Sequence, residues 1–305
     1  MKKQRFFLLT ILMLFTFACV SKIPEPPPSP TVTAAEKTTE LPNTEEADQT
    51  KQTDTPASAA LPPEPQAVSF SAEDGVFLEG LFYPAEKKSA PVIVLMHWYP
   101  GDQHEWTEIA YWLQNRGGSG NQNGVPWKDP SWFPTLSANL SFNILTFTFR
   151  NCQGGCSSPE PAGWLKDARA SLEYARILEG VDPNRVITIG ASIGSDGAID
   201  GCATVLEVDP TACLGALSLS PGSYLGPDYS DMVTALGANT PPRIAWCLFD
   251  ENEADSVVCN QAEGDNYYHE SWSDGYLHGM HLLTPNLDPL PLARIIEFLE
   301  FVLDQ

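Results

Sequence analysis

The chain has 305 residues, and 39 acidic against 17 basic residues give it a formal net charge of −22. Such a charge repels nucleic-acid phosphates and anionic lipid surfaces, so we expect no nucleic-acid partner. Once the N-terminal segments are set aside, the remaining length permits one α/β domain with a sizeable core.

Residues 1–19 have the pattern of a signal peptide. Lys2, Lys3 and Arg5 precede an apolar run over residues 6–17, which is too short to span a bilayer comfortably. The following Ala18-Cys19 looks like the end of a bacterial lipobox, although Thr16 occupies the position that is usually Leu. We predict an exported chain that is membrane-anchored through lipid on Cys19, with an ordinary cleaved signal peptide as the alternative.

Residues 20–66 are rich in Pro, Thr, Glu and Ala and contain no aromatic residue. Such a segment cannot bury enough apolar surface to offset the entropy lost on ordering, so we predict a disordered tether. Behind a lipid anchor, this tether would hold the domain at 67–305 off a membrane, at the cell surface or facing the periplasm.

Within residues 67–305, apolar runs of strand length alternate with segments of helical period. The first two strands are expected to pair antiparallel around a turn at residues 73–75. The alternation predicts an α/β fold, with a mostly parallel central sheet and helices on both faces. The expected strands are 68–71, 77–83, 91–96, 143–149, 186–189, 214–219 and 243–249, and the expected helices are 105–116, 163–178 and 292–303.

A serine between two near glycines, Gly190-Ala191-Ser192-Ile193-Gly194, follows the strand at 186–189 and precedes small residues that can form a helix. This is the layout of a nucleophile elbow, whose sharp turn lifts the serine Oγ above the sheet edge. Side chains in place of the two glycines would collide with neighbouring backbone. Ser192 is therefore the candidate nucleophile.

With this layout the chain resembles the α/β-hydrolase superfamily, and more closely its dienelactone-hydrolase-like and prolyl-oligopeptidase-like branch. The resemblance covers nearly all of residues 67–305 and implies the α/β-hydrolase fold and an acyl-enzyme on Ser192. The segments that carry it are, in chain order, residues 74–84, His97-Trp98-Tyr99-Pro100-Gly101, Phe149-Arg150-Asn151, residues 181–186 and the elbow.

In this superfamily the acid and then the histidine follow the serine along the chain. His278 is the expected base, because it and the following residues resemble the His-Gly-x-x-Leu-Leu run of relatives, and His281 is the alternative. The acid should follow the strand at 243–249. Asp255 is the expected acid, because residues 255–258 resemble the Asp-x-Val-Val turn of the family, and Glu253 is the alternative.

An acyl-transfer site also needs N–H donors that stabilise an oxyanion. The resemblance implies the backbone of Ile193 as one donor and that of Tyr99 as the other, with Trp98 as the alternative to Tyr99. Trp98 stands where many relatives have glycine, and its bulk is expected to narrow the pocket or turn the backbone. We interpret His97 as a structural residue that orients this loop.

Residues 117–134 look like an insertion between a helix and the next segment. A Gly- and Asn-rich run is followed by Trp127, Trp132 and Phe133 among prolines. Together with Trp98, these are the candidate substrate-binding residues, as an aromatic flap over the pocket. The alternative is a surface loop that is pinned by its own aromatic side chains.

Six cysteines are left once Cys19 is assigned to lipid, and export permits disulfides. Six cysteines allow 15 pairings, and we expect sequence neighbours to pair, as Cys152–Cys156, Cys202–Cys213 and Cys247–Cys259. No histidine lies near the closely spaced first pair, so we expect no zinc site, and we expect no cofactor.

The function expected from these features is that of a carboxylesterase-like serine hydrolase acting on a small-molecule ester. A serine peptidase of the same fold is the first alternative, and acyl transfer to an acceptor other than water would use the same residues. The alternative from another class is a non-catalytic surface binding protein that keeps the fold. Esters are favoured over peptides by analogy at the level of the fold, because no propeller accompanies the domain.

Overall fold

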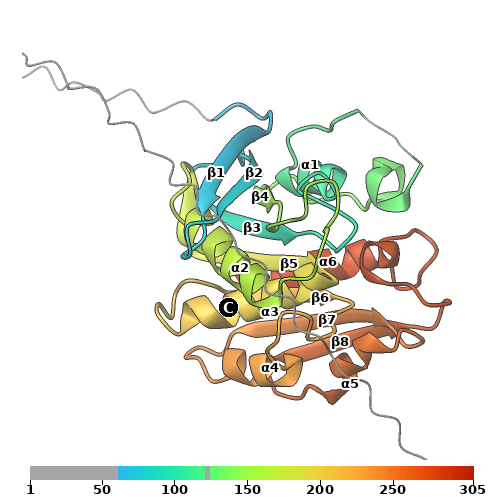
Figure 1. Ribbon diagram of the computed structural model, residues 1–305. Helices are drawn as coiled ribbons and strands as arrows, with labels where there is room; N and C mark the ends of the chain where they lie inside the picture. The colour runs from blue at the N-terminus through green and yellow to red at the C-terminus, as the bar shows by residue number, and fades with distance from the viewer. Residues whose placement is uncertain (1–60, 121–123) are drawn as a thin grey trace, which may run out of the picture. The chain divides into compact units, whose positions relative to one another are not determined.

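The computed structural model describes residues 61–120 and 124–305. They form an eight-stranded sheet with the strand order β1-β2-β4-β3-β5-β6-β7-β8 (Figure 1). The β1–β2 and β2–β4 pairs are antiparallel, and every other neighbouring pair is parallel. The strands are β1 Gln66–Ser71, β2 Phe77–Tyr83, β3 Ala90–Met96, β4 Asn143–Phe147, β5 Val181–Ala191, β6 Gly215–Leu219, β7 Ile244–Asp250 and β8 Tyr267–Trp272.

Helices cover both faces of this sheet, as the alternation of strands and helices predicts. On one face α2, α3 and α4 bury side chains such as Trp164, Ile199 and Val233 in one apolar core. On the other face α1 and α6 bury Ile109 and Ile295 in a second core. The helices are α1 Thr107–Gln114, α2 Pro161–Ala175, α3 Ile193–Leu206, α4 Tyr229–Gly237, α5 Val258–Gln261 and α6 Pro291–Leu303, with short 3-10 turns η1 Pro126–Lys128, η2 Pro130–Trp132, η3 Asp255–Val257 and η4 Gly279–Leu282.

The central strands are the most deeply buried part of the molecule. All seven residues of β3 and the last six of β5 are buried, because helices cover both of their faces. In β1, at the edge, partly buried or buried residues alternate with exposed ones. The ends of β3 and β5 therefore form a rigid base for the residues that follow them, at 97 and 192.

Among the longer elements, β8 and α4 were not expected from the sequence. β8 reads Tyr-Tyr-His-Glu-Ser-Trp and lies at the sheet edge with most of its residues at least partly exposed, so it lacks the apolar run of a central strand. α4 has one short apolar stripe, with Tyr229, Val233 and Leu236 buried. Asp228 caps its start by accepting the N–H of Ser230.

The predicted signal peptide, the lipid-carrying Cys19 and nearly all of the predicted tether lie outside the described residues. Residues 61–66, the end of the expected tether, do contact the domain. Arg116 donates to the Leu61 carbonyl at 2.9 Å, and Gln114 donates to the Pro63 carbonyl at 2.8 Å. Residues from Leu61 onward therefore pack on the domain, a few residues before the expected boundary at 67.

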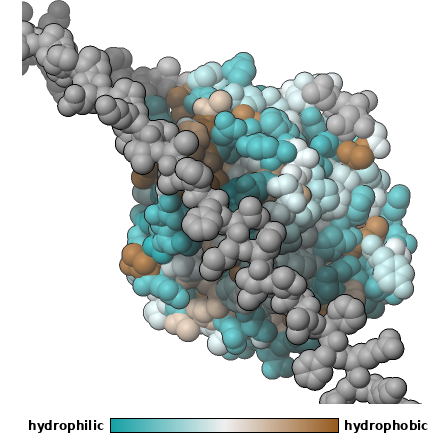
Figure 2. All heavy atoms as spheres, viewed as in Figure 1, coloured by the Kyte–Doolittle hydropathy of each residue, from teal (hydrophilic) through white to brown (hydrophobic). Residues whose placement is uncertain are grey.

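The surface shown in Figure 2 is mostly hydrophilic, with small separate apolar spots. Within residues 61–120 and 124–305, no helix has the length and apolar character needed to cross a bilayer.

Three disulfides join the six cysteines as sequence neighbours, in the pairing that was predicted. Their Cα–Cα distances are 3.6 Å for Cys152–Cys156, 5.5 Å for Cys202–Cys213 and 6.0 Å for Cys247–Cys259. The second joins α3 to Cys213, two residues before β6, and the third joins β7 to α5.

Candidate active site

Ser192 lies on a sharp turn between β5 and α3. Its backbone has φ 53° and ψ −121°, a conformation that is strained for a residue with a side chain. A Cβ at Gly190 would overlap the Gly194 carbonyl, and a Cβ at Gly194 would overlap the Met96 carbonyl. Both glycines are thus required by close backbone approach, as the elbow predicts.

His278 faces this serine. Its Nε2 lies 2.8 Å from Ser192 Oγ, which is hydrogen-bond distance. The next residue, Gly279, has φ +58°, and a Cβ there would lie 3.1 Å from the Trp98 ring and 3.6 Å from Ser192 Cβ. Glycine at 279 therefore lets the histidine loop approach the elbow, while the Gly279 N–H is held by Ser220 Oγ at 2.9 Å.

His281, the alternative base, is turned away from this contact. Its ring packs edge-on against Trp98 and Trp127, with centroid distances of 5.0 Å and 5.1 Å. Burial lowers the pKa of His281, and the neighbouring His278 lowers it further. Of the two candidates, the structure brings His278 to Ser192.

Glu253, the alternative acid, lies beside His278. Its Oε2 is 3.6 Å from His278 Nδ1, within ion-pair range but longer than a hydrogen bond. Hydrogen bonds from the backbone N–H and the hydroxyl of Ser256 hold the same oxygen. Bonds of this kind in ligand-free sites often shorten only when substrate is bound.

Asp255, the acid expected first, lies elsewhere. It begins the 3-10 turn η3, its side chain is exposed, and its carboxylate accepts the Tyr224 hydroxyl at 3.1 Å. Glu253 is partly buried beside His278, whereas Asp255, two residues later, is exposed. The structure therefore brings together Ser192, His278 and Glu253 and leaves Asp255 outside that set.

Asp250, at the end of β7, links the acid loop to the histidine loop. Its buried carboxylate accepts the N–H of Asn252 at 2.8 Å, that of Asp274 at 3.2 Å and that of Leu277 at 3.3 Å. Because Asn252 precedes Glu253 and Leu277 precedes His278, one side chain at the end of β7 holds the segments that carry Glu253 and His278.

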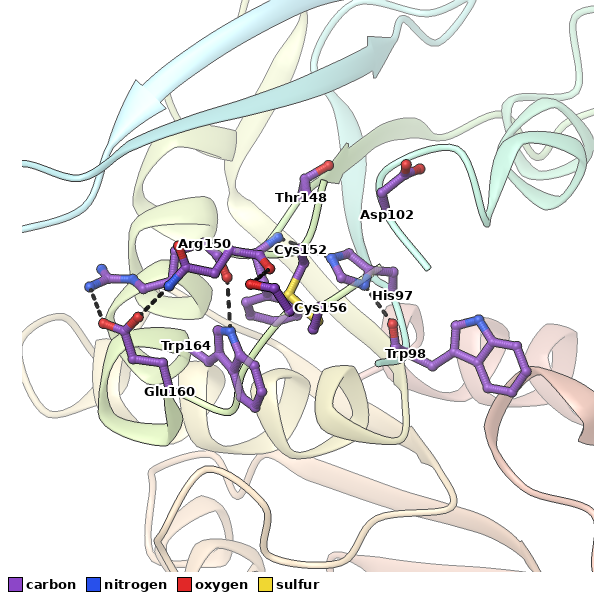
Figure 3. Close-up of a disulfide and its surroundings, with 12 residues drawn as sticks. His97, Trp98, Asp102, Thr148, Arg150, Cys152, Cys156, Glu160 and Trp164 are labelled. Carbon is purple, nitrogen blue, oxygen red and sulfur yellow. Dashed lines mark hydrogen bonds and ion pairs between the residues drawn. A yellow bond between two sulfur atoms is a disulfide. The ribbon is translucent and has the colours of Figure 1, made fainter. Parts of the chain in front are cut away.

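His97 orients the loop after β3. The Phe149 N–H donates to His97 Nε2 at 3.0 Å, so the imidazole proton is on Nδ1, which donates to the Trp98 carbonyl at 2.7 Å (Figure 3). Burial lowers the pKa of His97 to about 4, which keeps the ring neutral. Since N–H and C=O point in opposite directions across a trans peptide, the Tyr99 N–H is directed away from His97.

The expected oxyanion donors lie where β3 and β5 end side by side. Ile193 is the first residue of α3, so its N–H has no intrahelical acceptor. The carbonyl of Tyr99 is held by the Cys156 N–H at 2.9 Å, at the end of the turn that the Cys152–Cys156 disulfide closes. The N–H groups of Ile193 and Tyr99 have no acceptor among the described residues, so both are free to bind a reacting oxygen.

Arg150 anchors the segment that leads into this turn. It is buried, and its guanidinium donates to Asp167, Asp74 and Glu160, while its carbonyl accepts the Trp164 indole N–H at 3.1 Å (Figure 3). Hydrogen bonding to Arg150 lowers the pKa of Asp74 to about 2. The sequence marked Arg150 only as part of a family motif, and its role as an anchor follows from these contacts.

The four candidate substrate-binding aromatics separate into two pairs. Trp98 and Trp127 pack edge-on at 5.7 Å and meet the histidine loop through His281. Trp132 and Phe133 pack against each other, and Phe133 packs on Trp112 of α1. The first pair adjoins the site, whereas the second pins its own loop.

Sequence reasoning missed Ser220 and Asp196, which lie beside the site. Ser220 follows β6 with φ 55° and is fully buried, and Asp196 is buried in the first turn of α3. The one available signal was the spacing of four residues between Ser192 and Asp196, which places both on one face of a helix.

Comparison with known proteins finds relatives in sequence and in structure. No family model matches the chain. YfhR of Escherichia coli K12, an uncharacterized protein, is 28% identical over 135 residues, which cover 44% of this chain and 40% of that protein. An uncharacterized protein of Mycobacterium tuberculosis H37Rv is 24% identical over 145 residues, 47% of this chain and 43% of that protein. The matches thus span less than half of either relative.

Solved structures resemble most of the described domain. An esterase of Pyrobaculum calidifontis superposes with a TM-score of 0.51 and 12% identity, over 79% of this chain and 86% of its own. An esterase of Pyrococcus furiosus superposes with a TM-score of 0.53 and 15% identity, over 78% of this chain and 92% of its own. The 2,6-dihydroxy-pseudo-oxynicotine hydrolase superposes with a TM-score of 0.53 and 12% identity, over 79% of this chain and 68% of its own. At these identities the likeness concerns the fold alone.

Proposed function

We propose that this chain, which has the α/β-hydrolase fold, is a serine hydrolase that cleaves carboxylic esters through an acyl-enzyme on Ser192. The observation that carries the proposal is the 2.8 Å distance between His278 Nε2 and Ser192 Oγ, on a turn that only glycine neighbours permit. A serine hydroxyl is a weak nucleophile at neutral pH and needs such a base within hydrogen-bond reach.

In the proposed reaction Ser192 Oγ attacks the ester carbonyl carbon while its proton passes to His278 Nε2. The tetrahedral intermediate carries its negative charge on the former carbonyl oxygen, which the N–H groups of Ile193 and Tyr99 stabilise. His278 then returns the proton to the departing alkoxide, and the ester C–O bond breaks. Water, activated by His278 in the same way, releases the acid from Ser192.

Glu253 is the proposed acid, in place of Asp255. Its carboxylate lies 3.6 Å from His278 Nδ1 and would stabilise the imidazolium that forms during each proton transfer. Hydrogen bonds from Ser256 fix it on one side, and the Asp255 N–H donates to its other oxygen at 3.2 Å. Asp255 itself bonds Tyr224 and is exposed to solvent.

Esters are proposed ahead of peptides because two of the three solved structures described above are esterases by name, an analogy at the level of the fold. The test compares p-nitrophenyl acetate with p-nitroacetanilide, which differ only in the bond that is cleaved. We expect a burst of p-nitrophenol from the ester, and Ser192→Ala should lower kcat by about 10³-fold or more. Equal turnover of the anilide would favour the peptidase, and no turnover of either would favour a binding protein.

We also propose that the protein is exported and carries lipid on Cys19. Three disulfides support export, because such cross-links persist in oxidising compartments. The test is labelling of cells with an alkyne analogue of palmitate. Label and protein should both be in the membrane fraction, and Cys19→Ser should lose both. A Cys19→Ser variant that keeps the label would overturn the assignment.

A further inference from the structure

A buried carboxylate with no part in the reaction just described lies one helical turn from the nucleophile. Asp196 is 1% exposed and faces residues 220–224, the loop that follows β6. Its Oδ1 accepts the Gly222 N–H at 3.3 Å, and its Oδ2 accepts the Tyr224 N–H. The N–H groups of one short loop thus converge on a single side chain of α3.

The loop needs such a partner because its backbone is strained. Ser220 and Ser223 have φ values of 55° and 57°, in the left-handed region that side chains disfavour. Residues in this region persist only where surrounding contacts hold them. Where residues with left-handed backbone alternate with residues of ordinary backbone, successive N–H groups point toward one place and form a concave site for an anion. The Asp196 carboxylate occupies that site from within the protein.

The same loop holds the proposed base. Ser220 Oγ accepts the N–H of Gly279, the residue after His278, at 2.9 Å. The Tyr224 ring packs edge-on to the His278 ring at 6.4 Å, and the Tyr224 hydroxyl donates to Asp255. Contacts therefore run without a break from α3 through the loop to the imidazole.

We propose that Asp196 is a positioning residue, whose carboxylate holds the loop at 220–224 so that Ser220 and Tyr224 keep His278 against Ser192. The proposal rests on the proposed roles of Ser192 and His278. In consequence, the helix that begins at the nucleophile also determines where the base lies.

The charge of Asp196 gives this role a measurable signature. Burial raises the pKa of Asp196 to about 7, although the N–H groups of residues 222–224 act to lower it. The titratable groups that face it are Asp200 on α3, Tyr224 on the loop and Tyr229 on α4, and burial raises the pKa of each, which favours their neutral forms. Asp196 therefore changes charge near neutral pH.

The pH dependences of activity and of stability should then have opposite signs. Ionised Asp196 accepts N–H bonds with both oxygens, so catalysis should improve as pH rises through 7. The folded state holds this proton more tightly than the unfolded state, whose carboxyl has the ordinary pKa of 3.8. The contribution of Asp196 to the unfolding free energy therefore falls between about pH 4 and 7.

Asp200 is the matched control. It is buried one turn further along α3, but its Oδ2 has no hydrogen-bond partner among the described residues, and neither of its oxygens bonds the loop. Asp196→Asn replaces one acceptor oxygen with an NH2 group that would face an N–H donor. Asp200→Asn makes the same chemical change on the same helix without touching the loop.

The experiment measures hydrolysis of p-nitrophenyl acetate from pH 5 to 9, and amide hydrogen exchange, in the wild type and both variants. Asp196→Asn should lower kcat by about 10- to 100-fold with little change in KM, since a small displacement of a catalytic group costs this much. The acid limb of its pH profile should lose one ionisation. The amides of residues 222–224 and 279 should exchange faster. Asp200→Asn should match the wild type in all three respects.

Ser220→Ala provides a second route, because it breaks the same chain of contacts at its other end. Its defect should be similar and should not add to that of Asp196→Asn, and it also tests the proposal where Asp196→Asn fails to fold. Equal kcat, pH profile and exchange in Asp196→Asn and Asp200→Asn would overturn the inference. An inactive wild type would instead overturn the proposed function, and the exchange of residues 222–224 and 279 would still decide whether Asp196 holds the loop.

Discussion

At the scale of single residues, the site depends on backbone positions that few side chains allow. Ser192 is strained at φ 53° between two glycines that cannot be replaced, and Gly279 at φ 58° lets its loop approach the serine. These backbone positions determine where the His278 ring lies, because His278 directly precedes Gly279 and its Nε2 reaches Ser192 Oγ. The role of His278 as the base can therefore be tested by comparison with His281, three residues further along the chain.

His278→Gln and His281→Gln form a matched pair. The first removes the group 2.8 Å from Ser192 Oγ and should lower kcat for p-nitrophenyl acetate by about 10³-fold or more. The second removes a ring that packs on Trp98 and Trp127, so its main effect should be on KM. Steady-state kinetics separate the two, and the reverse order of kcat losses would assign the base to His281.

Glu253→Gln and Asp255→Asn distinguish the two acids. Losing the charge beside His278 Nδ1 should lower kcat by about 10²- to 10⁴-fold, as neutralising the acid of a serine triad does. Asp255→Asn changes an exposed side chain that bonds Tyr224, so most of kcat should be retained. A larger loss of kcat in Asp255→Asn than in Glu253→Gln would assign the acid to Asp255, as the family motif indicates.

Asp200→Asn should stabilise the protein at alkaline pH. Burial and the charge of Asp196 raise the pKa of Asp200 well above 3.8, so the folded state binds a proton that the unfolded state releases. Stability is then lost as pH rises above the unfolded pKa, and a neutral amide escapes this loss. In urea unfolding, the free energy of unfolding of the variant should increase relative to that of the wild type as the pH rises from 5 to 9. A constant difference would contradict the assignment.

Sequence reasoning named the serine and the histidine that the structure brings together, and it gave Glu253, the acid that lies beside His278, only as the alternative to Asp255. The elbow depends on steric rules within five residues, and the residues from His278 onward match a family run, so local reading was sufficient. Glu253 and Asp255 are two residues apart, and the 3-10 turn that begins at Asp255 decides which faces His278. Ser220 and Asp196 act through contacts between distant segments, which one sequence does not reveal.

At the scale of elements, apolar runs and helical spacing predicted the central strands and the three main helices, because both faces of those strands are buried. β8 and α4 were missed, since an edge strand with polar residues and a nine-residue helix have weak patterns. The strands that were predicted are those that position the site. Residues 97, 192 and 220 each follow the end of a strand, and Asp250 ends β7.

The disulfide between β7 and α5 should matter for activity as well as stability. Cys247–Cys259 spans the acid loop, and replacing both residues with Ser should cost about 3 kcal/mol of unfolding free energy in the chain-entropy treatment and also lower kcat. Cys202–Cys213 closes a loop of nearly the same length, 11 against 12 residues, away from Glu253.

The corresponding double serine variant at 202 and 213 should therefore lose similar stability in urea unfolding but keep its kcat below the unfolding midpoint. Equal losses of kcat in the two variants would show that the Cys247–Cys259 disulfide has no specific effect on the acid loop.

At the scale of the whole molecule, the described residues of the site and of both apolar cores form one unit within residues 61–305. A chain shortened to 61–305 should thus fold and hydrolyse p-nitrophenyl acetate at the rate of the full chain. Shortening to 67–305 removes the carbonyls that accept Arg116 and Gln114 and the first residue of β1. The second chain should melt at a lower temperature, and equal melting temperatures would place the start of the domain at 67.

The most direct test of the central claim is covalent labelling with a fluorophosphonate, followed by mass spectrometry of the peptide that contains residues 186–206. The account predicts one adduct on Ser192 in the wild type, slow labelling in His278→Gln and none in Ser192→Ala. An adduct on any other residue, or undiminished labelling without His278, would contradict the pairing of this serine with this histidine.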